Sequence, residues 1–127
     1  MHRQGKYEEA IRWQKQALET FEGVRDSAKA AVTLLKIASS MIFEEEFDET
    51  RLAIQKAEFY QRSLPMEDMQ RVLLDIRKAH LQIAKGDRIL GEKSLQEVKR
   101  SLEEKSAPPE YWVDWEEVYV IFHQKEN

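Results

Sequence analysis

The chain has no cysteine and little glycine or proline. Its 127 residues include 4 glycines and 3 prolines. Without cysteine, disulfides, thiolate nucleophiles and thiolate zinc sites are all excluded. Few β-branched residues stand between the apolar positions, so strands and tight turns have little to be made from. The composition therefore favours helices, and the lack of disulfides favours a cytoplasmic location.

A large excess of charge of one sign is also missing. Charged residues make up 35% of the chain, and the net charge is -4. Such a mixed-sign surface is typical of soluble helical proteins, whereas nucleic-acid binding asks for a basic excess. No apolar run approaches the roughly 20 residues that span a bilayer. We therefore expect no nucleic-acid partner and no membrane insertion.

Motifs for metal binding and catalysis are absent as well. The three histidines, His2, His80 and His123, lie far apart, and none has a histidine or glutamate partner at a metal-ligand spacing. Neither a glycine-rich phosphate loop nor a serine elbow occurs. We expect no metal, no cofactor and no enzymatic activity.

Apolar residues at helical spacing are what the chain does contain. Hydrophobic residues make up 42% of it, enough to cover a single core, so one domain over 1–127 is expected. Interruptions such as Gly23, Pro65, Gly86 and Pro108 divide the periodicity into six segments. Pro65 is expected in the first turn of the fourth helix. The expected helices are about 6–22, 27–46, 48–63, 66–85, 88–105 and 109–124.

The first, third and fifth segments share a frame, which indicates an internal repeat. The first copy reads Gly-Lys-Tyr-Glu-Glu-Ala-Ile over residues 5–11, followed by Ala17 and Leu18. The second reads Glu-Phe-Asp-Glu-Thr over residues 46–50, followed by Ala57. The third is Gly86-Asp87, followed by Gly91, Leu95 and Val98. Together these copies resemble the tetratricopeptide repeat, with a spacing of roughly 40 residues that is typical of a longer-helix variety.

This resemblance implies an all-α fold of antiparallel helix pairs, stacked into a short right-handed α-solenoid of six helices. It also implies a protein–protein interaction scaffold or adaptor that binds a protein or peptide. In the family, the first helix of each pair lines the concave surface. The matching positions are Lys36, Ser39, Ser40, Phe43, Arg77 and His80. The polar and basic positions among them suit a carboxylate or an acidic segment, although Lys36 and Arg77 are equally well explained as solvated charges.

The last expected helix carries an aromatic stripe that includes Trp112, Trp115 and Tyr119. Such a stripe either packs on the fifth helix or anchors contact with a second chain or a neighbouring repeat. The chain is also basic between Arg71 and Arg100 and acidic beyond Leu102. These regions either pair within the fold or leave a basic surface for an acidic partner.

Two other functions remain open. The opening helix also resembles that of the three-helix microtubule-interacting-and-transport domain, although such domains do not repeat. A regulatory helical-repeat protein with phosphatase-like activity is the second alternative. It requires a catalytic side chain, for which His80 or a glutamine is the best candidate.

Overall fold

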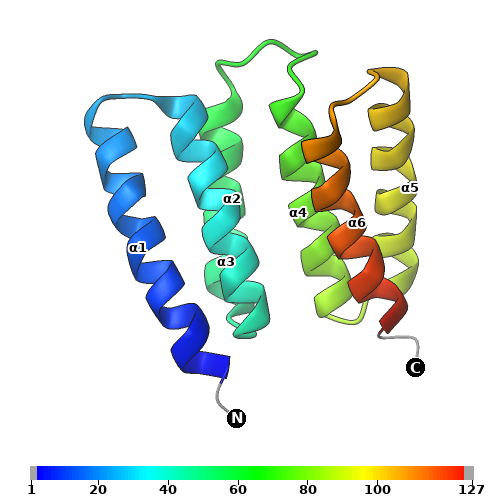
Figure 1. Cartoon of the computed structure of the whole chain (residues 1–127), viewed down its shortest axis with the longest axis horizontal. Coiled ribbons are helices and arrows are strands. Elements are labelled where there is room, and N and C mark those ends of the chain that lie inside the picture. The colour runs from blue at the N-terminus through cyan, green and yellow to red at the C-terminus, as the bar shows by residue number, and fades with distance from the viewer. Residues whose placement is uncertain (1–2, 125–127) are drawn as a thin grey trace. The chain divides into compact units, whose positions relative to one another are not determined.

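A computed structural model describes residues 3–124, which form six α-helices and no strand (Figure 1). The helices are α1 (Arg3–Gly23), α2 (Ser27–Phe43), α3 (Phe47–Gln61), α4 (Gln70–Ala84), α5 (Arg88–Glu104) and α6 (Pro109–Gln124). The expected all-helical fold with six helices is confirmed. The packing of adjacent helices is consistent with a helical-repeat stack.

Several helix ends follow directly from local sequence. Asp26 caps α2, because its carboxylate accepts a hydrogen bond from the backbone N–H of Lys29 at 3.1 Å. Gly86 follows α4 with φ +93°, a left-handed conformation that glycine adopts without a steric penalty. The start of α2 and the stop after α4 therefore lie where the sequence predicts them.

The expected end of α2 at residue 46 is wrong, because the helix stops at Phe43. Glu45 adopts φ +61°, and the N–H of Glu46 bonds to the carbonyl of Met41 at 2.9 Å. The N–H of Glu45 bonds to the carbonyl of Ile42 at 3.0 Å. This pair of bonds is the Schellman arrangement, which satisfies the last carbonyls of a helix. Here a non-glycine residue takes the left-handed position, so no glycine marks the stop.

The expected start of α4 at residue 66 is also wrong, because the helix begins at Gln70. Pro65 therefore does not lie in its first turn. The carboxylate of Asp68 accepts a hydrogen bond from the N–H of Gln70 at 2.8 Å, and its carbonyl accepts one from Arg71 at 3.1 Å. A short acidic side chain competes with the helix for backbone donors. The helix consequently starts after Asp68 rather than at Pro65.

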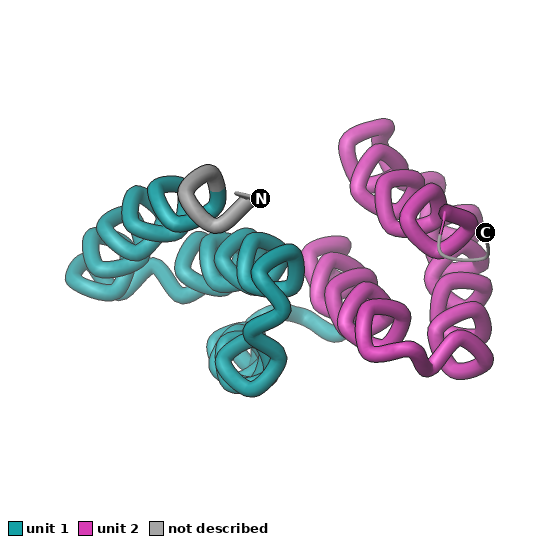
Figure 2. Tube along the Cα trace, turned by 90° about the horizontal axis from the view of Figure 1, so that it is seen from below, with its two compact units in different colours: residues 1–66 teal, residues 67–127 magenta. Residues whose placement is uncertain are grey.

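The chain divides into two compact units, residues 1–66 and 67–127 (Figure 2). In the first unit, α2 packs against both α1 and α3, and each helix runs antiparallel to the one before it (Figure 1). Small side chains, among them Ala31, Ala38 and Ala57, are buried in this unit and allow close helix approach. A single domain over the whole chain, and the right-handedness of a solenoid, stay predictions.

The second unit contains α4, α5 and α6, and each of these helices packs against the other two. Their buried apolar residues form one cluster: Val72, Ile76, Ala79, Ile83, Leu95, Val98, Leu102, Trp115, Val118 and Phe122. Gly91 lets α5 approach α4 closely, because a Cβ built there would lie 2.5 Å from Cγ1 of Ile83. This unit carries most of the candidate binding residues.

Candidate protein-interaction surfaces

The four candidate residues on α2 differ in accessibility. Lys36 is exposed and Ser39 is half-buried. The hydroxyl of Ser40 is buried and donates to Oε1 of Gln14 on α1 at 3.4 Å. The Phe43 ring stacks on Tyr7, with centroids 5.2 Å apart and an interplanar angle of 8°. Ser40 and Phe43 thus hold α1 against α2, which leaves Lys36 as the accessible charge of this group.

Arg77 and His80 are buried within the second unit. Nη2 of Arg77 donates to both carboxylate oxygens of Asp114 on α6, at 2.9 and 3.1 Å. Nη1 lies 2.9 Å from Nδ1 of His80. Arg77 is therefore not a solvated charge, and its guanidinium ties α4 to α6. Arg77 lies in the basic stretch of the chain and Asp114 in the acidic one. Their ion pair is therefore an example of these two stretches pairing within the fold.

The aromatic stripe of α6 passes from the core to the surface. Trp115 is buried, and its Nε1–H donates to the carbonyl of Leu95 on α5 at 2.9 Å. Trp112 is half-buried and lies edge-on to Trp115, with ring centroids 5.8 Å apart. The ring of Tyr119 also stacks on Trp115, with centroids 5.0 Å apart, and Tyr119 is exposed. Trp115 therefore belongs to the buried cluster of the second unit, Trp112 packs against that cluster, and Tyr119 is the accessible end of the stripe.

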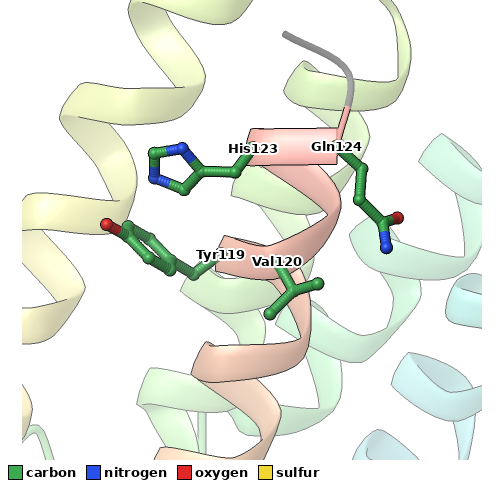
Figure 3. A pocket seen from close by; sticks show the side chains of 4 residues that line it. All are labelled: Tyr119, Val120, His123 and Gln124. Carbon is green, nitrogen blue, oxygen red and sulfur yellow. The ribbon is translucent and has the colours of Figure 1, made fainter. Parts of the chain in front are cut away.

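A shallow pocket of about 310 Å³ lies beside Tyr119, at the C-terminal turns of α6 (Figure 3). It is lined by Tyr119, Val120, His123 and Gln124. The His123 ring lies edge-on to Tyr119, with centroids 4.3 Å apart. The pocket offers an aromatic and aliphatic surface rather than a set of convergent charges.

The outer face of α6 carries an exposed stripe that sequence reasoning did not single out. Glu110, Val113, Glu117 and Val120 follow the i, i+3, i+7 spacing of one helix face, and all four are exposed. We call this set the acidic stripe. Val113 and Val120 add to the apolar content of the helix. Only the packing shows that these valines face away from the core.

A polar cluster of Glu22, Lys56 and Tyr60 joins α1 to α3 in the first unit. The Tyr60 hydroxyl donates to Oε2 of Glu22, and Nζ of Lys56 lies 2.9 Å from the same oxygen. The Tyr60 bond, followed by the Lys56 bond, lowers the pKa of the Glu22 carboxyl. The same bond raises the pKa of the Tyr60 phenol above its usual value. Both donors are directed at one carboxylate, so the cluster serves to hold two helices together.

Within residues 3–124, no group of three or more acidic or histidine side chains is arranged to hold a metal ion. None of the helices there is long and apolar enough to cross a membrane.

Comparison with known proteins gives no match: no family model, no curated protein and no solved structure corresponds to the chain. The likeness to the tetratricopeptide repeat therefore depends on the residues quoted above.

Proposed function

We propose that the chain is a helical-repeat scaffold of the tetratricopeptide type that binds another protein through the acidic stripe of α6. The observation that carries this proposal is the exposure of Val113 and Val120, which are 56% and 51% accessible. They lie two turns apart on one face, and Glu110 and Glu117 alternate with them. Exposed apolar side chains bordered by polar ones are typical of interaction surfaces.

A basic amphipathic helix is the occupant that this surface fits. Apolar anchors at i and i+7 are the pattern by which one helix recognises another. Between Pro109 and Gln124, α6 has neither lysine nor arginine, so nothing on the same helix offsets Glu110 and Glu117. A partner helix that alternates apolar and basic residues satisfies both features, since its cations meet the two carboxylates.

The buried candidates support this surface rather than contact the partner. Arg77 holds α6 through Asp114, and Trp115 anchors the helix to α5 through Leu95. Lys36 and Ser39 remain candidates for a second contact on α2. In this proposal the chain acts in the cytoplasm as an adaptor and has no catalytic role.

A labelled model peptide tests the proposal. The peptide is a helix of leucine and lysine with leucines at i, i+3 and i+7, and its binding is followed by fluorescence anisotropy. We expect binding that weakens as salt rises, because exposed charges are screened. Replacing Val113 and Val120 by serine should weaken binding at least tenfold.

The chain offers a matched control on α3. Leu52 and Phe59 are also seven residues apart and are 60% and 58% accessible, so their replacement by serine removes a comparable apolar surface. This control variant should bind the peptide as the wild type does. The proposal is wrong if the control loses binding instead, or if an acidic peptide with the same leucines binds equally well.

A further inference from the structure

The outer face of α5 carries a second exposed stripe, of opposite charge. Ile89, Lys93, Gln96 and Arg100 share one face of the helix, and all four are exposed. We call this set the basic stripe. Ile89 is 85% accessible, which is unusual for a large aliphatic side chain. The helix packs on its neighbours through a different face, since Gly91 meets Ile83 and Leu95 bonds to Trp115.

When their helices lie antiparallel, the two stripes form one apolar pair and two pairs of opposite charge. Ile89 then meets Val120, Lys93 meets Glu117 and Arg100 meets Glu110, while the polar Gln96 lies opposite Val113. At 1.5 Å per residue, each stripe is about 15 Å long, so the apolar and charged contacts stay in register. Glu92 and Glu97 flank the basic stripe and are exposed. They disfavour shifted registers, because like charges brought together repel.

These stripes cannot meet within one chain. The helices α5 and α6 pack on each other in the second unit through the Leu95–Trp115 side, and both stripes point away from that contact. We infer that the partner of the acidic stripe is the basic stripe of a second copy of this chain. The inference rests on the proposed function, because it names the occupant of the same surface.

Association of this kind is head-to-tail. One contact between two copies uses the basic stripe of one copy and the acidic stripe of the other, so each copy can make a second contact through its remaining stripe. Such a heterologous contact generates a ring where its rotation closes and an open filament where it does not. One helix face per copy is smaller than the about 800 Å² per partner of a standard interface. We therefore expect self-association only at about 0.1 mM chain or above.

Analytical ultracentrifugation of the full chain tests this inference. The wild type should show an average mass that rises with concentration in low salt and returns to that of a monomer in about 0.5 M salt. This measurement needs no variant. A wild type that stays monomeric at about 1 mM in low salt overturns the inference.

Charge reversal identifies the surfaces. One variant combines Glu110→Lys with Glu117→Lys, and the other combines Lys93→Glu with Arg100→Glu. Each variant alone should lose self-association, because its two stripes then carry the same charge. An equimolar mixture should regain it, since every stripe again finds a complement. Failure of the mixture to associate, with helix content intact by circular dichroism, overturns the inference.

Matched controls reverse the same number of charges on α1. Arg12→Glu with Lys15→Glu changes exposed residues outside both stripes, as does Glu8→Lys with Glu9→Lys. Both controls should associate as the wild type does. A loss of association in either control would show that net charge, rather than the stripes, governs it, and would contradict the inference.

The two proposals fail in distinguishable ways. The Lys93→Glu, Arg100→Glu variant keeps the acidic stripe and should still bind the model peptide while it stays monomeric. Peptide binding by a wild type that never self-associates would reject the second copy as the partner and leave the proposed function standing. A wild type that neither binds the model peptide nor self-associates would reject the proposed function as well.

Discussion

Replacing Asp114 by alanine should lower the free energy of unfolding by about 3 kcal/mol. The change leaves the Arg77 guanidinium buried without its carboxylate. The Arg77 side chain is only 8% accessible and that of Asp114 is 23% accessible, and Nε of Arg77 already lacks a hydrogen-bond partner. Breaking a fully buried ion pair costs about 3–5 kcal/mol. Because Asp114 is partly exposed, water reaches this ion pair, and we expect a cost at the lower end of that range.

Urea denaturation followed by tryptophan fluorescence measures the effect, because Trp112 and Trp115 lie on the same helix as Asp114. A double variant, Arg77→Met with Asp114→Leu, should regain most of the lost stability, since it leaves no buried charge unpaired.

An exposed ion pair supplies the control. Arg51 and Asp48 lie 3.9 Å apart with side chains 56% and 90% accessible, so Arg51→Ala, which leaves the first-turn acid Asp48 in place, should change stability by less than about 0.5 kcal/mol. The reasoning is refuted if Asp114→Ala costs less than about 1 kcal/mol, or if the double variant is no more stable than Asp114→Ala.

Three further predictions concern packing and pH. Gly91→Ala should destabilise the chain by about 1–3 kcal/mol, because its Cβ would lie 2.5 Å from Cγ1 of the fully buried Ile83. Gly23→Ala, with nothing within 4 Å, should be tolerated, and equal urea midpoints for the two would contradict this account. Glu22→Gln should lower the raised pKa of Tyr60, measured by ultraviolet titration of the phenol, because its charged acceptor is removed. Since the pKa of Glu22 is lowered in the fold, its contribution to stability is present above the usual carboxyl pKa of about 4.3 and lost as pH falls through the lowered value. Identical acid unfolding of wild type and Glu22→Gln would contradict it.

The sequence predicts helix starts well where a single local signal marks them. Ser27, Arg88 and Pro109 begin α2, α5 and α6, each at the predicted residue. Asp26 caps α2 through its side chain and Pro109 stands at the start of α6, whereas Asp87 precedes α5 without a side-chain capping bond. The prediction fails where two local signals compete. Pro65 and Asp68 both suit a helix start, and the hydrogen bond that Asp68 makes to the next helix decides between them.

The candidate site was predicted less well, for a physical reason that Arg77 and Trp115 illustrate. Periodicity shows that a residue lies on a given face of its helix, but not which neighbour covers that face. The sequence places Arg77 with the groove residues, yet Arg77 is buried and bonds to Asp114 of α6. The sequence allows Trp115 to be either a core residue or a contact residue, and the bond to Leu95 shows that it packs on α5.

The number, type and approximate extent of the helices follow from local sequence, because caps, breakers and apolar spacing act over one or two turns. Which polar groups meet depends instead on how the helices pack. Tyr60 bonds to Glu22, 38 residues away, and Arg77 bonds to Asp114, 37 residues away. Such contacts depend on how each helix is rotated against its neighbours. The rotation of α6 against its neighbours also leaves Val113 and Val120 exposed. Although apolar residues surround much of this helix, only one side of it is buried.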